Sequence, residues 1–399
     1  MKTRLSPGTR VLMLGIVAFV VLAMPKAALG VAWPSIADDL DRSLADLGLL
    51  IAAYVAGYFV STLANGELTR RFGSGVLLTA AASLGTVSLV GIALAPSWGM
   101  FLIATLLLGT AGGLVDAGVN AHIAVGYGAK AMGFLHSGFG VGSVLGPLLL
   151  TALLALGVSW RAGFAAVALL QIAIAAGFAL DRRQWDSTRP APGRGRRRPE
   201  GGGSAAALSL LAFALYAGIE VGAGEWSFSL LTEGRGLSDT IAGLAVAAFW
   251  GGLTVSRFVL GVLGDGGRPN TVLGASGLGA LGGLLLLWWN PMVWLGTLGL
   301  VFAGIALGPY FPLQMLFTPA RFGPAYTPWM AGYQIAAASA GAAVIPGGIG
   351  LLVAAGGLEA VAPVLAIAAA GLVIATAVLR RAGRTAPLMH VPPPGPRGA

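Results

Sequence analysis

The chain has 399 residues, of which 56% are hydrophobic and only 10% are charged. A soluble domain averages roughly 25% charged residues, so this composition excludes an ordinary water-soluble protein and indicates a membrane protein. The sequence has no cysteine, which excludes disulfides and thiolate metal ligands, and its 63 glycines suit membrane helices that pack closely through small residues.

The net charge of +9 is distributed unevenly along the sequence. Most of the 24 Lys and Arg residues fall in the tails and in alternate loops, on one side of the predicted helices. The positive-inside rule turns this asymmetry into an orientation in the cell inner membrane, with both termini cytoplasmic. We therefore expect membrane lipids, and no nucleic acid, as partners of the basic residues. The first apolar stretch, from Val11, has no clear cleavage site, so we expect no cleavable signal peptide.

Twelve apolar stretches are long enough to span a bilayer, which takes about 20 helical residues. The first six cover residues 11–35, 47–69, 75–95, 98–123, 131–157 and 160–180. The second six cover residues 205–231, 239–264, 270–289, 291–317, 328–354 and 357–379. This pattern predicts an all-α membrane protein with 12 transmembrane helices.

The segment between the two sets of helices, residues 181–204, is rich in arginine, proline and glycine. Its composition predicts a basic, disordered linker in the cytoplasm. We therefore expect an N-terminal six-helix bundle over residues 11–180 and a C-terminal six-helix bundle over 205–381. The remaining residues, 382–399, are Pro-rich and are predicted to form a disordered tail.

The two sets of helices repeat each other. Gly66 and Gly261 are 195 residues apart, and so are Gly109 and Gly304. Glycines at one matched spacing in separate regions indicate two pseudo-symmetric halves. Such repeats predict a solute site at mid-membrane between the halves, with alternating access by rocking of one half against the other.

The loop predicted after the second helix has a counterpart in the second half. The first copy reads Gly66-Glu67-Leu68-Thr69-Arg70-Arg71-Phe72-Gly73, and the second reads Gly261-Val262-Leu263-Gly264-Asp265. Both resemble the cytoplasmic Gly-x-Leu-x-Asp-Arg-x-Gly loop of the major facilitator superfamily, although Arg70 stands where that loop has Asp. The resemblance implies gating or structural roles for Gly66, Arg71 and Asp265.

A narrower resemblance is to the fucose/glucose–proton symporter group of that superfamily. It is carried by residues 114–120, 135–140, 216–226, 249–257, 304–312 and 334–346. The resemblance implies a polar solute, such as a sugar, moved together with protons. One position differs, because Gly30, four residues before Pro34, stands where the group has an acid on its first helix, and Lys26 lies one turn earlier.

Several ionisable residues lie inside the predicted helices, where an unpaired charge costs several kcal/mol. They are Lys26, Asp116, His136, Glu220, Glu225 and Arg257. Three of them, Asp116, Glu220 and Glu225, are candidates for proton coupling. Asp116 precedes Asn120 by four residues and shares its helix face, and the resemblance implies that this helix lines the cavity. The alternative for Asp116 is a static structural pair.

Lys26 and Glu220 are candidates for an ion pair between the two halves. Lys26 follows residue 11, and Glu220 follows residue 205, by the same 15 residues. At 1.5 Å rise per residue, both lie roughly 22 Å from the cytoplasmic end of their helices. The alternative is that Lys26 pairs within its own half.

Two alternative roles are predicted for each of Glu225 and Arg257. Glu225 is the repeat equivalent of Gly30, so it either replaces the missing acid or lies at the outer mouth of the cavity. Arg257 lies near the inner end of its helix, which favours a structural role. The alternative is that Arg257 faces Asp116 or an anionic solute.

Amide, imidazole and aromatic side chains are the candidate solute contacts. They are Asn120, His136, Trp226, Trp250, Tyr310 and Gln334. Amides donate and accept hydrogen bonds, as hydroxylated solutes require, whereas membrane aromatics also serve as packing or interface anchors. We expect a neutral polar solute of hexose size to contact Trp226 and Asn120.

The leading hypothesis is therefore a monomeric, proton-coupled symporter of a small polar solute. The alternative is a proton-antiport exporter of amphipathic compounds, and a third possibility is a sensor that transports nothing. We expect no enzyme, cofactor or metal site, because the sequence has no His-Glu-x-x-His, Gly-x-Ser-x-Gly or Walker motif and only three histidines.

Overall fold

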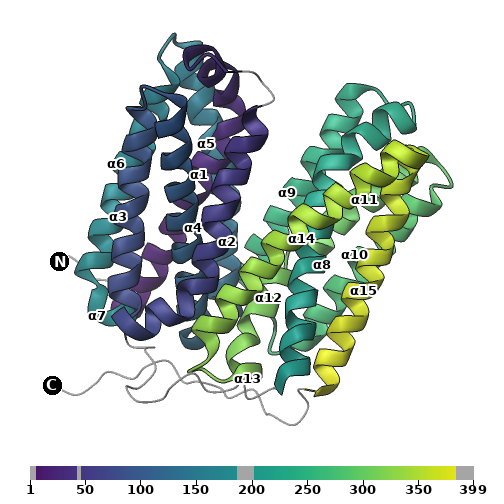
Figure 1. Cartoon of the computed structure of the whole chain (residues 1–399). Helices are drawn as coiled ribbons and strands as arrows, with labels where there is room; N and C mark the ends of the chain where they lie inside the picture. Colours follow the sequence, from purple (N-terminus) through teal and green to yellow (C-terminus); the bar gives the residue numbers. More distant parts are fainter. Residues whose placement is uncertain (1–5, 43–45, 187–201, 383–399) are drawn as a thin grey trace. The chain divides into compact units, whose positions relative to one another are not determined.

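The computed structural model describes residues 6–42, 46–186 and 202–382, and within them the regular structure is helical (Figure 1). Twelve of the described helices are long and apolar enough to cross a membrane. This confirms the predicted all-α membrane fold with 12 spans. The predicted tail over residues 383–399 and the linker residues 187–201 lie outside the described residues.

The helices of the first half are α1 (Pro7–Asp39), α2 (Leu47–Phe72), α3 (Ser74–Ala93), α4 (Trp98–Gly126), α5 (Ala129–Ala155), α6 (Trp160–Leu180) and the short α7 (Arg182–Trp185). The second half contains α8 (Gly202–Ser229), η3 (Leu230–Gly234), α9 (Asp239–Leu263), α10 (Pro269–Trp289), α11 (Val293–Leu307), α12 (Tyr310–Leu316), α13 (Thr318–Phe322), α14 (Thr327–Gly356), η4 (Leu358–Ala360) and α15 (Val361–Ala382).

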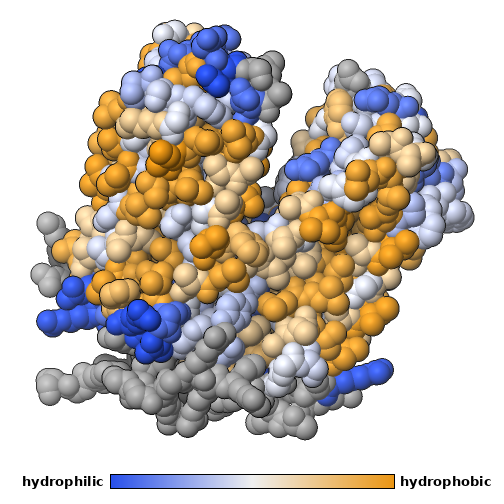
Figure 2. Space-filling model, viewed as in Figure 1, coloured by the Kyte–Doolittle hydropathy of each residue, from blue (hydrophilic) through white to orange (hydrophobic). Residues whose placement is uncertain are grey.

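By their internal contacts the residues divide into two compact units. Unit 1 takes in residues 1–125, 135–195 and 325–332, as far as they are described. Unit 2 takes in residues 126–134, 196–324 and 333–399, again as far as they are described. In each unit, hydrophobic residues cover the sides of the helices and hydrophilic residues gather toward the helix ends, as a membrane environment requires (Figure 2).

The repeat seen in the sequence is also a repeat of packing contacts. A Cβ on Gly109 of α4 would overlap the carbonyl oxygen of Tyr54 on α2, and a Cβ on Gly304 of α11 would overlap that of Phe249 on α9. Both members of the second pair follow the first by 195 residues. The two units therefore use the same glycines to bring equivalent helix backbones into contact.

The predicted tenth span is interrupted. α11 ends at Leu307 and α12 begins at Tyr310, so the span is made of two helical pieces. Pro309 and Pro312 cause this interruption, because proline has no N–H to donate to the residue four positions earlier. The carbonyl of Gly308 thereby loses its helical partner, the N–H of residue 312, and is available to a side chain.

The first residues of the predicted linker are folded. Asp181 forms an ion pair with Arg10, with 2.6 Å between Asp181 Oδ1 and Arg10 Nη2. Helix α7 follows directly. Trp185 is fully buried, with its ring centroid 4.6 Å from that of His122 and 5.2 Å from that of Phe178. Burial of this large ring explains why the segment adopts a fixed structure despite its polar composition.

Candidate functional site

The carboxylate of Asp116 lies at the centre of a polar cluster in unit 1. The Tyr58 hydroxyl of α2 donates to Asp116 Oδ2, and the Asn120 Nδ2 of α4 donates to Asp116 Oδ1 at 2.6 Å. Asn120 lies one turn after Asp116, which is why the two side chains meet on one helix face. Both of these donors are neutral groups.

His136 extends this cluster to α5. Its Nε2 lies 3.2 Å from Asn120 Oδ1. Because the Asn120 amide nitrogen donates to Asp116, the amide oxygen is the acceptor and His136 donates from Nε2. The imidazole also meets the ring of Phe19 edge to face, at 5.7 Å between centroids. The structure therefore brings together three residues that were predicted separately: Asp116, Asn120 and His136.

Tyr54 and Tyr58 are the members of this site that sequence reasoning missed. They lie one turn apart on α2 with stacked rings, 6.1 Å between centroids. The available signal was their four-residue spacing in the apolar first half of α2, since a carboxylate inside a membrane requires hydrogen-bond donors nearby.

Lys26 of α1 acts on the same carboxylate. The Lys26 side chain is exposed, and its positive charge interacts electrostatically with the carboxylate of Asp116. The alternative in which Lys26 pairs within its own half stays a prediction. The Lys26–Glu220 pair would join the two units, and it stays a prediction.

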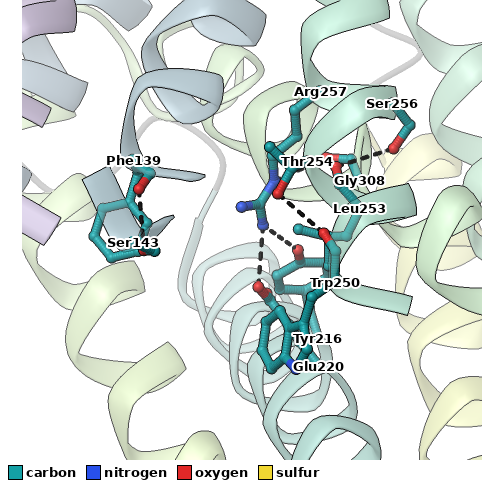
Figure 3. Close-up of polar contacts among 10 residues, drawn as sticks. All are labelled: Phe139, Ser143, Tyr216, Glu220, Trp250, Leu253, Thr254, Ser256, Arg257 and Gly308. Atoms are coloured by element: carbon teal, nitrogen blue, oxygen red, sulfur yellow. Dashed lines mark hydrogen bonds and ion pairs between the residues drawn. The ribbon is translucent and has the colours of Figure 1, made fainter. Parts of the chain in front are cut away.

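Unit 2 contains a second cluster of ionisable residues, centred on Arg257 (Figure 3). Its Nη2 donates to the Tyr216 hydroxyl at 2.8 Å and to Glu220 Oε1 at 3.2 Å. Tyr216 and Glu220 lie one turn apart on α8, so a single guanidinium from α9 reaches both. Arg257 Nε lies 3.4 Å from the carbonyl of Gly308, the group that Pro312 leaves without a helical partner.

Tyr310 and Gln334 are fully buried in unit 2 and are bonded to protein groups. The Tyr310 ring stacks on that of Tyr216 at 5.4 Å and 6°, and its hydroxyl bonds to Thr376. Gln334 Nε2 donates to Ser209 at 2.9 Å, and Gln334 Oε1 accepts from Thr318 at 2.9 Å.

The predicted contacts on α8 and α9 have more open surroundings. The indole N–H of Trp226 donates to the carbonyl of Pro346 at 3.0 Å, and the side chain is partly exposed. Trp250 is 38% exposed and meets the ring of Phe249 edge to face. Glu225 is also exposed.

The remaining predicted residues make local contacts at helix ends. Arg71 donates to Glu67 at 2.7 Å, and Arg70 pairs with the same carboxylate. Asp265 accepts from the N–H of Gly267 at 2.9 Å and closes the turn after α9. Gly66 is buried and leaves no room for a Cβ. Among the described residues, no group of three or more His, Asp or Glu side chains is placed to hold a metal ion.

Two relatives of known sequence are similar to parts of the chain. Bypass of stop codon protein 6 of Saccharomyces cerevisiae is 26% identical over 282 residues, 62% of this chain and 55% of that protein. The hexuronate transporter of Bacillus subtilis is 26% identical over 158 residues, 38% of this chain and 37% of that protein. The chain thus spans about half, or less, of the length of these relatives.

A solved structure shares the fold over most of the chain. The fucose:proton symporter FucP of E. coli superimposes with a TM-score of 0.70 at 16% identity, covering 92% of this chain and 98% of that one. The sequence also matches the Major Facilitator Superfamily over residues 15–220, more than half of its 399 residues. These matches confirm the resemblance and the expectation of a protein that is not an enzyme, and the chain belongs to the Major Facilitator Superfamily.

Proposed function

We propose that this protein is a proton-coupled secondary transporter that moves a small polar solute, such as a sugar, across the inner membrane by alternating access. Residues 11–180 and 205–381 are the two halves that move against each other, and both termini lie in the cytoplasm. The protein acts as a monomer in contact with membrane lipids.

The observation that carries the proposal is the setting of Asp116. A carboxylate in an apolar span is costly when charged, and its two direct hydrogen-bond donors, Tyr58 and Asn120, are neutral. A group held in this way can change its protonation state without leaving a buried counter-charge unpaired. This is what a proton carrier requires, whereas a structural carboxylate is better served by a direct ion pair.

The similarity to known transporters supports a polar solute. FucP is a fucose:proton symporter, and the relative from Bacillus subtilis is a hexuronate transporter. We assign Glu220 and Glu225 as further candidates for proton coupling, and Asn120, His136, Trp226 and Trp250 as candidate solute contacts. Trp226 is partly exposed, and an indole ring suits stacking of a sugar ring.

The test is solute accumulation by the purified protein in liposomes under an inward pH gradient. We expect Asp116→Asn to abolish accumulation driven by the pH gradient but to retain solute exchange between the two sides, because exchange requires no net proton movement. Asp38→Asn, at the exposed end of α1, is the matched control and should accumulate solute normally.

Two outcomes would contradict this proposal. If Asp116→Asn still concentrates solute under the pH gradient, Asp116 is not the coupling site. If lipophilic cations leave the liposomes in exchange for protons and polar solutes do not move, the protein is an exporter of amphipathic compounds.

A further inference from the structure

We propose that the solute carries a carboxylate, and that Arg257 binds this carboxylate while Glu220 takes up a proton, in addition to the proton that Asp116 carries. This inference rests on the proposed transport function and names the substrate class. It concerns a site formed entirely within unit 2, by α8, α9 and the break between α11 and α12.

The first observation is that Arg257 is buried but has donors to spare. Its side chain is 8% exposed, and its partners engage only Nη2 and Nε. Figure 3 shows the other terminal nitrogen, Nη1, directed away from Tyr216 and Glu220. Among the described residues no partner is recorded for Nη1, so two N–H groups of a buried guanidinium are available. Nη1 can therefore donate to a solute carboxylate, and the two-nitrogen fork that binds a carboxylate forms when Glu220 releases Nη2.

The second observation is that the Arg257–Glu220 contact is loose. One bond of 3.2 Å joins the two groups, at the long end for a charge-assisted pair, which usually lies near 2.7–2.9 Å. The Glu220 side chain is 16% exposed and also bonds to the Tyr216 hydroxyl. Glu220 therefore neutralises Arg257 through Nη2 and leaves Nη1 available, so a second carboxylate can approach from the side of Nη1.

Charge balance then couples the solute to a proton. Arg257 and Glu220 together carry no net charge, and adding a solute carboxylate makes the buried group net negative, which is costly in a membrane. Protonation of Glu220 restores neutrality. The solute carboxylate takes over the ion pair with Arg257, and the proton on Glu220 enters with the anion, in addition to the proton on Asp116.

Several other ionisable residues lie on α8 and on the described elements that pack against it. The elements that pack against α8 include α9, α11, α12, α14, α15 and η3. Besides Glu220, α8 and these elements contain nine ionisable residues. One is Asp239 at the start of α9, and the others are Tyr216, Glu225, Glu233, Arg257, Tyr310, Tyr333, Arg380 and Arg381. Of the charged members, Arg257 is the one in contact with Glu220 in the described structure.

Trp250 indicates the size of the solute. It precedes Arg257 by seven residues, which places it on the same face of α9 and about 10 Å along the helix axis. Helical side chains lean toward the N-terminus, so the Arg257 guanidinium lies on the Trp250 side of its own Cα. An exposed indole at this distance offers an apolar face to the far end of a solute of about six carbons whose carboxylate binds Arg257.

The test compares carboxylates with their neutral counterparts. The full chain, in detergent, is heated with gluconate, glucuronate or quinate, and in parallel with glucitol, glucose or inositol, at pH 6 and pH 8. We expect at least one carboxylate to raise the melting temperature, more at pH 6 than at pH 8, and its neutral counterpart to have no effect. If one proton binds together with each anion, the affinity for the anion falls by up to about tenfold for each unit by which the pH rises.

Three variants make the test specific. Glu220→Gln keeps Arg257 available, so it should bind the carboxylate equally at both pH values. Arg257→Gln should lose the response, but it leaves Glu220 buried without its partner and is liable to misfold. The double variant Arg257→Gln/Glu220→Gln removes both charges, should fold, and should not respond to any carboxylate.

The inference is overturned if no carboxylate shifts the melting temperature, if the neutral counterparts shift it equally, or if the double variant still responds. Flux assays separate this result from the transport proposal. Accumulation of a neutral sugar by wild type and double variant alike supports transport and overturns the carboxylate inference. Carboxylate binding as expected, with no flux under any gradient, supports the inference about the ligand and contradicts transport.

Discussion

Asn120 donates to the carboxylate of Asp116 at 2.6 Å and accepts from His136 through the other end of the same amide. The amide thus fixes its own orientation, because each end has a partner of opposite hydrogen-bonding character. A substitution of Asp116 or of His136 therefore alters the hydrogen bond that Asn120 can make with the other residue. The first two predictions follow from this cluster.

Tyr58→Phe removes one of the two direct donors to Asp116. The charged carboxylate then lacks a hydrogen bond, at a cost of roughly 1–3 kcal/mol. We expect solute accumulation under a pH gradient to fall by about tenfold or more, while the protein still folds. The matched control is Tyr54→Phe, one turn away in the same stack, which should accumulate solute at nearly the wild-type level. Equal losses in both variants would show that the stacked rings, and not the Tyr58 donor, are required.

The partner of Lys26 can be identified with two double-mutant cycles. Lys26 acts electrostatically on Asp116 in unit 1, so Lys26→Met and Asp116→Asn should be non-additive in thermal stability, by roughly 0.5–3 kcal/mol. The same cycle with Glu220→Gln tests the predicted ion pair between the halves. Additive effects there would rule out that pair, and additive effects in the Asp116 cycle would contradict the interaction within unit 1.

The glycines of the repeat should be intolerant of a methyl group. Gly109→Ala and Gly304→Ala each place a Cβ on a carbonyl oxygen of the neighbouring helix. Each should lower the stability by roughly 1–3 kcal/mol, as overpacking does. Gly99→Ala and Gly251→Ala are the controls, since a Cβ at either position meets no atom within 4 Å. Unchanged melting temperatures for all four variants would show that these helix contacts are not tight.

Trp185 should be essential for the fold of the segment after α6. Trp185→Ala removes a fully buried ring that contacts His122 and Phe178. We expect a loss of roughly 3–5 kcal/mol, the usual cost for a buried aromatic, together with faster proteolysis near residue 185. Trp289→Ala, at a position 76% exposed, should change neither measurement. Wild-type protease resistance in Trp185→Ala would contradict this role for the ring.

The sequence by itself determined the spans, the repeat and the ionisable residues within the spans. Apolar length predicts a membrane helix directly, because a helix inside a bilayer satisfies its own backbone hydrogen bonds and needs only apolar side chains outward. The glycines 195 residues apart were informative for a similar reason, since close packing of two backbones excludes a Cβ whatever the surrounding sequence.

Only the tertiary structure decided which side chains meet. The position of Glu220 along its helix matches that of Lys26, yet Glu220 contacts Arg257. Position along a helix fixes depth in the membrane, but lateral neighbours depend on how helices pack. Tyr58 meets Asp116 because α2 and α4 approach at Gly109. Gly308 accepts from Arg257 because Pro312 removes its helical donor and α9 lies alongside. The sequence contains each of these residues, but the contacts follow from helix packing, which short-range patterns do not specify.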